Sequence, residues 1–405
     1  MASLIWIGFV LMVLGLLALD LGVFHRKTQP VSIKEAFAWT AFWIALALAF
    51  NVFVFFLYEH HWLGFGSALR HELDGGQAAL RFFTGYLVEK SLSVDNIFVI
   101  AMIFAYFKVP LAFQHRVLYW GILGALVMRG VMIVVGAALI ATFSWTVYLF
   151  GAILLVTAAR LLVVRHDNIE PGRNPVVRLV RRAFPVTEDF HGSHFFTSIE
   201  GRRAVTPLFV ALIVIETSDV LFAVDSIPAI FAITTDPFLV FTSNVFAILG
   251  LRSLYFAVAG MVERFRYLKM SLVFLLAFIG VKMMLSHHHP IPTVVSLVVI
   301  LGILSVGVLA SIFASHRDTA RLESPLVDDL EDLAMVGVRQ ARRISILIVG
   351  STVLILGAAM LVLPGPGLLV TLGGLAILAI EFVWARRWLA RVREMYEKAK
   401  RTVGM

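Results

Sequence analysis

Long apolar runs separated by short polar segments fill most of the chain. A membrane-spanning helix needs about 20 predominantly apolar residues, and runs near that length recur from one end of the sequence to the other. The pattern predicts an all-α, polytopic membrane protein with eleven transmembrane helices. They fall at residues 2–24, 36–58, 79–107, 117–140, 143–164, 206–233, 238–260, 267–286, 291–314, 344–363 and 367–385.

The polar segments between these runs carry an uneven share of the basic residues. If the N-terminus lies outside, 27 of the 34 Lys and Arg fall in inward loops or in the C-terminal tail. Only Arg70 and Arg81 then lie in outward segments. Because cytoplasmic loops are enriched in Lys and Arg, we predict an outside N-terminus and a cytoplasmic C-terminus.

Composition supports a membrane protein and narrows its chemistry. The chain of 405 residues is 60% hydrophobic and 15% charged, whereas soluble domains are about 45–50% apolar and about 25% charged. The net charge of +8 is explained by the inward loops, so nucleic-acid binding is not expected. The chain contains no cysteine, which excludes disulfides, thiolate metal sites and cysteine nucleophiles.

Polar segments also divide the chain into domains. Residues 1–315 form the larger one, and the polar, mildly acidic stretch 316–343 is typical of a cytoplasmic linker. Residues 344–405 hold two apolar runs joined by the sequence PGPG, which favours a transmembrane hairpin. The tail WARRWLARVREMYEKAKR predicts a basic amphipathic helix on the anionic inner surface of the membrane.

One motif occurs twice within apolar runs, as EKSLSVDNIFVI from Glu89 and as DVLFAVDSIPAI from Asp219. Both copies follow the pattern acid-x₄-V-D-[NS]-I-x-x-I. The next predicted helix of each half carries an arginine, Arg129 or Arg252. A third cation follows one helix later: Arg160 in the first half and Lys282 in the second.

The two motif helices have opposite predicted orientations, because three spans separate them. We therefore predict an inverted repeat of two three-helix units, at residues 79–164 and 206–286. Many secondary transporters, including LysE-like ones, are built this way, and their substrate binds near the bilayer midplane between the repeats.

Nine of the charged residues inside predicted spans, five acids and four bases, would be costly without partners. Each costs about 2.5–3.5 kcal/mol at the bilayer centre, so nine unpaired charges would cost on the order of 25 kcal/mol, more than the roughly 5–15 kcal/mol of a domain's net stability. They must therefore face one another or a hydrated cavity. The five acids are Glu89, Asp95, Glu216, Asp219 and Asp225, and the four bases are Lys90, Arg129, Arg252 and Lys282.

Two interpretations of these charges remain open. They can form structural salt bridges, a role that Arg129 and Arg252 suit. The acids outnumber the bases, however, and Asn96, Ser218 and Ser226 add neutral oxygens beside them. Carboxylate, amide and hydroxyl oxygens without thiols suit a hard divalent cation such as Mn²⁺, Mg²⁺ or Ca²⁺. Exchange with protons would be a natural partner reaction.

Helix geometry restricts how these ligands could meet. In a straight helix Glu89 and Asn96 share a face, while Asp95 points about 100° away. The second copy of the motif has the same spacing. Convergence on one ion therefore predicts a helix break, and Pro228 is its expected place in the second copy.

Other motifs are sparse. No GxSxG, Walker or HExxH pattern accompanies the acids, so we expect neither an enzyme nor a permanently bound cofactor. The histidine runs at 60–61 and 287–289 are expected to be solvated rather than metal-binding.

The motifs resemble the TerC family of bacterial membrane proteins, in its longer Alx-like form. The resemblance extends over residues 1–315 and is carried by LDLGVFHRK, GYLVEKSLSVDNIFV, HRVLYWGILGALVMRG, TPLFVALIVIETSDVLFAVDSIPAIFAIT and NVFAILGLRSLYF. It implies metal-ion transport in the bacterial inner membrane, with manganese efflux as the main role and tellurium resistance as the older label. The family's acidic motifs match Glu89, Asp95, Asn96, Glu216, Asp219, Asp225 and Ser226. The tail from residue 344 resembles the PGPGW family, with Leu368 in place of the tryptophan.

Two functions follow as hypotheses. In the first, the protein is a secondary transporter that exports Mn²⁺ or a similar ion against protons. Glu89, Asp95, Asp219 and Asp225 would then be ligands, supported by Asn96, Ser226, Glu216 and Ser218, with Arg129, Arg252, Lys90 and Lys282 as neighbouring cations. In the second, it is a non-transporting accessory protein that delivers metal to exported enzymes or contributes to tellurium or metal stress resistance.

Overall fold

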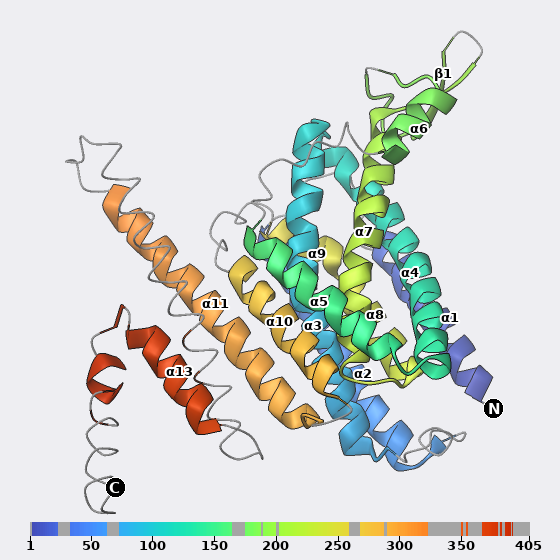
Figure 1. Ribbon diagram of the computed structural model, residues 1–405. Coiled ribbons are helices and arrows are strands. Elements are labelled where there is room, and N and C mark those ends of the chain that lie inside the picture. Colours follow the sequence, from blue (N-terminus) through green and yellow to red (C-terminus); the bar gives the residue numbers. More distant parts are fainter. Residues whose placement is uncertain are drawn as a thin grey trace, which may run out of the picture. The chain divides into compact units, whose positions relative to one another are not determined.

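The protein is mostly helical in a computed structural model (Figure 1). The structure describes residues 2–22, 33–62, 73–163, 175–187, 189–199, 202–258, 268–286, 290–322, 350, 354, 367–379, 381–382, 385–389 and 391. Five helices in this part of the chain are long and apolar enough to cross a membrane: Lys34–Glu59, Leu111–Thr142, Pro207–Phe231, Pro237–Val258 and Thr293–Ser311. Shorter apolar helices lie at Leu4–Ala18, Thr146–Leu162 and Met270–Leu285.

The chain forms two compact units. The first contains Met1–Leu154 and Val164–Val262, and the second contains Leu155–Val163 and Glu263–Met405. The first unit holds α1 (Ala2–Gly22), α2 (Ile33–Glu59), α3 (Gly75–Tyr106), α4 (Leu111–Thr142), the first half of α5 (Thr146–Val163), α6 (Pro175–Ala183), β1 (Phe196–Ile199), β2 (Arg202–Val205), α7 (Pro207–Phe231), α8 (Pro237–Ile248) and α9 (Leu251–Val258).

Four helices make the centre of the first unit. α3 packs against α8 and α7, and α4 packs against α7. Glycines allow the close approach: a methyl added to Gly121 of α4 would lie 3.4 Å from Ile215 of α7, and one added to Gly136 would lie 2.7 Å from Phe231. The residue farther along α4 contacts the residue farther along α7, so the two helices run parallel. Small residues at helix contacts are the usual way to pack helices within a membrane.

α3 and α7, the two helices that carry the repeated motif, run antiparallel. Gly85 of α3 approaches Ile230 near the end of α7, whereas Ile100 of α3 lines a cavity together with Ile215 from the first half of α7. Figure 1 shows the two helices crossing the unit in opposite directions.

An aromatic core joins α1 and α2 to α8. The ring centroids of Phe50 and Phe246 lie 4.6 Å apart, and Phe9 contacts both rings and Phe238. The opposite faces of α1 and α2 are apolar and exposed: Leu11 is 63% exposed and Val52 is 57% exposed. Apolar side chains on the outside agree with a lipid surround rather than water.

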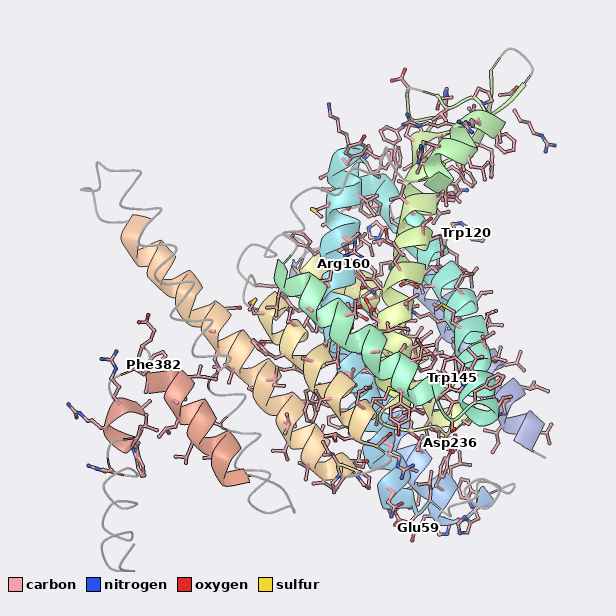
Figure 2. All side chains as sticks on the ribbon, viewed as in Figure 1. Glu59, Trp120, Trp145, Arg160, Asp236 and Phe382 are labelled. Atoms are coloured by element: carbon pink, nitrogen blue, oxygen red, sulfur yellow. The ribbon has the colours of Figure 1, made fainter. Side chains whose placement is uncertain are left out.

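Acidic caps fix the helix starts at one end of this unit. Asp74 accepts a hydrogen bond from the backbone N–H of Gln77 at the start of α3. Asp236 caps α8 by accepting from Phe238 N and Leu239 N, and it also accepts from the hydroxyl of Tyr58 at 2.7 Å. Such caps satisfy backbone donors that a helix leaves unpaired at its N-terminus. Glu59 and Asp236 mark this end in Figure 2.

The predicted break at Pro228 is wrong, and a break occurs instead in a span that does not carry the motif. α7 is continuous through Pro228, which removes one backbone donor in the last turn without dividing the helix. The predicted span 238–260 is instead divided into α8 and α9. Gly250, with φ +80°, separates them, and a methyl there would lie 2.7 Å from the side chain of Trp43. Only glycine adopts this left-handed conformation readily.

A small polar module departs from the all-α prediction. β1 and β2 form a two-stranded antiparallel sheet in the register Phe196↔Val205 to Ile199↔Arg202. α6 and this sheet lie at the N-terminal end of α7, where Val177, Phe195 and Val205 join its hydrophobic core. The segment between the two halves that carry the motif is therefore partly folded.

The second unit contains α10 (Leu268–Leu285), α11 (Thr293–Leu322) and α13 (Gly367–Ala379). α10 packs on α11, where Met270 and Phe274 contact Ala310. α11 continues to Leu322, so the first residues of the predicted linker are helical. The rest of that linker, residues 364–366 of the PGPG sequence, nearly all of the span 344–363 and most of the basic tail lie outside the described residues.

Candidate functional site

Arg129 of α4 joins the two copies of the repeated motif. Its Nη1 donates a hydrogen bond to Oε1 of Glu89 on α3. Its Nε and Nη2 donate to Oδ2 and Oδ1 of Asp219 on α7, at 3.2 and 3.1 Å. Nη1 also donates to Oγ of Ser226 at 3.3 Å. Ser226 lies about two turns beyond Asp219 on the same face of α7. One guanidinium thus binds the first acid of both motifs.

The charges at this centre are buried and do not balance. Arg129 is 2% exposed, Glu89 is fully buried, and Asp219 is 14% exposed. A bidentate arginine–carboxylate pair is among the strongest polar contacts in proteins. Two carboxylates still face one guanidinium, and Oε2 of Glu89 has no hydrogen-bond partner among the described residues. Another positive charge, from a proton or a cation, would be accommodated here electrostatically.

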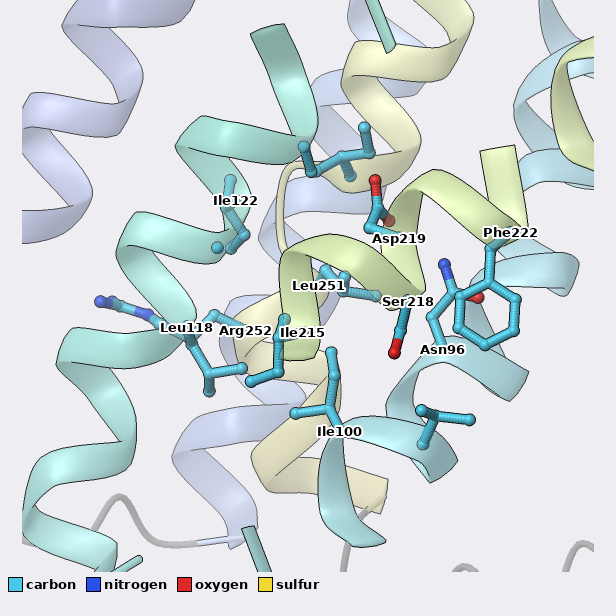
Figure 3. Close-up of a pocket in the computed structure, with 14 residues that line it drawn as sticks. Asn96, Ile100, Leu118, Ile122, Ile215, Ser218, Asp219, Phe222, Leu251 and Arg252 are labelled. Carbon is cyan, nitrogen blue, oxygen red and sulfur yellow. The ribbon is translucent and has the colours of Figure 1, made fainter. Parts of the chain in front are cut away.

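A cavity of about 30 Å³ adjoins Asp219. Its polar wall consists of Asn96 from α3, Ser218 and Asp219 from α7, and Arg252 from α9. Figure 3 shows the Arg252 side chain directed away from the Asp219 carboxylate. The remaining wall is apolar and includes Ile100, Leu118 and Ile215. A volume of at least about 10–15 Å³ holds a water molecule, so this space can hold water or a dehydrated ion.

The cavity extends from the acidic centre toward the end of the unit that carries α6 and the β1–β2 sheet. Leu118 and Ile215 lie between that end and the Arg129–Asp219 pair, because α4 and α7 both begin there. Asn96 and Ile100 follow Glu89 along α3 in the same direction.

Glu216 lies near this centre without joining it. Its half-buried carboxylate rests against the backbone of Gly124 on α4, where any added methyl would overlap it. Glycine at this position therefore leaves the space that the carboxylate fills.

Lys90, which the sequence predicted as a cation beside the acids, binds backbone carbonyls at the end of α8. Its Nζ donates hydrogen bonds to the carbonyl oxygens of Ala247 and Leu249, at 3.2 and 3.5 Å. These carbonyls belong to the end of α8, where the helix break leaves acceptors without intrahelical donors. A cation at a helix C-terminus is also favoured by the helix dipole.

The other predicted residues are more dispersed. Asp95 and Asp225 are half-buried, and neither is among the residues that line the cavity. Lys282 is buried on α10 of the second unit, whereas Arg160 on α5 is exposed. Within the described residues, no group of three or more His, Asp or Glu is arranged to hold a metal ion. This part of the chain therefore shows an arginine, rather than a metal site, between the acids.

Comparisons with known proteins agree with this arrangement of motifs. Residues 74–319 match the family model described as "Integral membrane protein TerC family". The chain belongs to the TerC family. Residues 343–395 match a second model, described as "Putative transmembrane protein (PGPGW)". The chain is thus an integral membrane protein with a TerC segment and a C-terminal PGPGW domain.

Curated TerC relatives cover most of this chain. It is 49% identical to "Uncharacterized membrane protein STKORF319" of Myxococcus xanthus, over 80% of this chain and 97% of the relative. It is 45% identical to "Putative membrane-bound redox modulator Alx" of Escherichia coli K12, over 78% of this chain and 96% of the relative. No solved structure matches.

Sequence reasoning missed part of this candidate site. It placed Arg129 and Arg252 beside the acids but did not predict that Arg129 would contact both Glu89 and Asp219. The glycines of GILGALVMRG gave an available signal: spaced three apart, Gly121 and Gly124 present one bare face of α4 to α7. That close approach lets the next turn of α4 bring Arg129 between the two acids.

Proposed function

We propose that the protein is a secondary transporter that exports Mn²⁺ or another hard divalent cation in exchange for protons. One observation carries the proposal: Glu89 and Asp219, from antiparallel helices with the same motif, share Arg129 in a buried position beside a partly polar cavity. Burial of these charges is costly, and charged groups inside membrane helices usually mark an ion pathway.

The proposed architecture is an inverted repeat. α3, α4 and α5 would form one unit, and α7, α8–α9 and α10 the other, in the bacterial inner membrane with the N-terminus outside. The antiparallel course of α3 and α7 supports this proposal, as does the pairing of each with the arginine helix of the opposite half. Inverted repeats place the substrate between them near the midplane.

The acids and the cavity suggest how a cation would be held. Asp219, Asn96 and Ser218 supply carboxylate, amide and hydroxyl oxygens to the same cavity, a ligand set that Mn²⁺ and Mg²⁺ prefer. Arg129 would keep Glu89 and Asp219 paired while no cation is present. Protonation of either carboxylate would weaken its hold on the cation, which is the simplest coupling of the two ions.

A second candidate function is that of an accessory membrane protein that transports nothing. The relatives named Alx carry the description "Putative membrane-bound redox modulator", and the acids surround an arginine rather than a metal site among the described residues. Any redox role for this chain would have to proceed without a thiol of its own, because the sequence contains no cysteine.

Reconstitution of the full chain into sealed vesicles distinguishes these functions. We expect a pH gradient to drive uptake of Mn²⁺ into the vesicles. A metal-sensitive dye trapped inside them detects the ion, and Mg²⁺, Ca²⁺ and Zn²⁺ serve as comparison ions. Asp219→Asn and Glu89→Gln should reduce flux to the level of empty vesicles. Asp189→Asn, at an exposed position in the segment between the halves, is the matched control and should leave flux unchanged. No ion flux from correctly folded protein would favour the accessory function.

A further inference from the structure

The two sides of the acidic centre differ, although the repeated motif supplies equivalent residues to both. Glu89 and Ser226 meet at Arg129 on one side. Their motif equivalents, Asp219 and Asn96, line the cavity on the other side. Because α3 and α7 are antiparallel, each motif contributes its acid to one side and its amide or hydroxyl to the opposite one.

On the other side of the Arg129 centre, the residues equivalent to the cavity lining are packed together. Ile100 and Ile215 line the cavity, and their motif equivalents are Ile230 and Gly85. These two residues pack together: a methyl added to Gly85 would lie 3.7 Å from Ile230 and 3.0 Å from Oγ of Ser243 on α8. No room for a water molecule remains between Gly85 and these neighbours.

Asn244 follows Ser243 on α8 and adds a second buried polar residue there. When Arg129 of α4 is aligned with Arg252, Asn244 is the equivalent of Gly121, which lines the cavity. Asn244 is 1% exposed, and neither its Oδ1 nor its Nδ2 has a hydrogen-bond partner among the described residues.

An amide buried in this way destabilises the conformation that buries it. A polar side chain without partners loses its hydration and gains nothing in exchange, whereas an apolar residue of similar shape would pack at the same place without that loss. The closed side therefore carries a group that hydration would stabilise. Packing alone does not explain an asparagine at this position.

We propose that Asn244 and Ser243 line a second half of the ion path, which is closed in this structure and opens to a hydrated divalent cation. This inference rests on the proposed transport function. The path would lead from Glu89 and Ser226 toward the end of the unit marked by Glu59 and Asp236 (Figure 2). It would open as the cavity beside Asp219 closes, in the alternating manner of inverted-repeat transporters.

The first test replaces the amide with an apolar group of similar size. Asn244→Leu should hold the protein in the present conformation, so we expect Mn²⁺ flux in vesicles to fall to background and the thermal unfolding midpoint to rise by a few degrees. Asn51→Leu on α2 is the matched control, because Oδ1 of Asn51 is also buried without a hydrogen-bond partner. It should not change flux. Wild-type flux from Asn244→Leu would overturn the inference.

A labelling test does not depend on the stability of that variant. Because the natural chain has no cysteine, Ser243→Cys and Ser218→Cys each introduce a single thiol. A membrane-impermeant maleimide should modify the Ser243→Cys protein only when Mn²⁺ is being transported, and the Ser218→Cys protein without Mn²⁺. Equal labelling of the Ser243→Cys protein with and without Mn²⁺ would overturn the inference.

The two failures can be told apart. If the proposed transport function is wrong, the unmodified protein shows no flux. Failure of the closed path alone would appear as normal flux in the unmodified protein together with the two contrary results above.

Discussion

Arg129 does what a lysine at the same position could not. Three of its nitrogens, held in a planar group, donate to Glu89, Asp219 and Ser226. A lysine ammonium is a compact charge that cannot reproduce the two parallel bonds to Asp219. The residue therefore fixes the relative positions of α3, α4 and α7 as well as neutralising charge.

Removal of this guanidinium should destabilise the protein strongly. Arg129→Gln leaves the carboxylate of Glu89 buried without a cation, and breaking a buried ion pair in this way costs about 3–5 kcal/mol. The free energy of unfolding, measured with denaturant in detergent micelles, checks this prediction.

A double substitution separates charge from packing. In Glu89→Gln/Arg129→Gln the fully buried charge is gone and only Asp219, which is 14% exposed, lacks its cation, so we expect part of the lost stability to return. Ion flux should not return, because the shared acidic centre is absent. If the double variant were as unstable as Arg129→Gln, the contribution of Arg129 would be packing rather than charge.

At the scale of elements, the α8–α9 break is set by one glycine and supported from two other helices. Trp43 of α2 packs against Gly250, and Lys90 of α3 binds the carbonyls at the end of α8. The break also lies at the cavity, since Ile248 and Leu251 line it. An irregular backbone within a membrane segment is tolerated where protein buries it.

Gly250→Ala tests the break by the sign of its effect. With φ +80° and Trp43 in contact, alanine should destabilise the protein by about 1–2 kcal/mol or more. If residues 238–260 were one continuous helix, alanine would instead stabilise it by roughly 0.5–1 kcal/mol. Gly8→Ala on α1, where an added methyl meets nothing within 4 Å, is the control. Unfolding midpoints of the three proteins decide between the two signs.

These elements show how far sequence reasoning extends. Apolar run length predicted the positions of α1 to α5 and of α7, α10 and α11, because a span in lipid must satisfy its backbone internally. It could not place the break, since one glycine in an apolar run is compatible with a straight helix. Pro228 looked like the stronger breaker, but α7 continues through it and ends three residues later, at Phe231.

The candidate site was predictable only in part, for a related reason. Helical spacing predicted that Glu89 and Asn96 share a face and that Asp95 diverges, and Asn96 lines the cavity whereas Asp95 does not. The contact of one arginine with both acids depends on how closely α4 approaches α7. That distance is set by Gly121 and Gly124 in tertiary packing, which periodicity along one helix does not contain.

At the scale of the whole molecule, the chain joins two families. The TerC match ends at residue 319, and α11 ends at Leu322. Relatives from Myxococcus and Escherichia align over 97% and 96% of their own length, yet over only 80% and 78% of this chain. The PGPGW match at 343–395 is separate. We infer that the C-terminal domain is an addition to a TerC protein that is complete without it.

A chain truncated after Leu322 should therefore insert, fold and carry the proposed flux. It retains Glu89, Arg129, Asp219 and the cavity, and it loses the basic tail expected to bind anionic lipid. We expect flux per molecule close to that of the full chain in vesicles of neutral lipid. Size-exclusion profiles and unfolding midpoints establish that the truncated protein is folded. If it is folded but transports nothing while the full chain does, the PGPGW domain takes part in transport, and the division drawn at Leu322 is wrong.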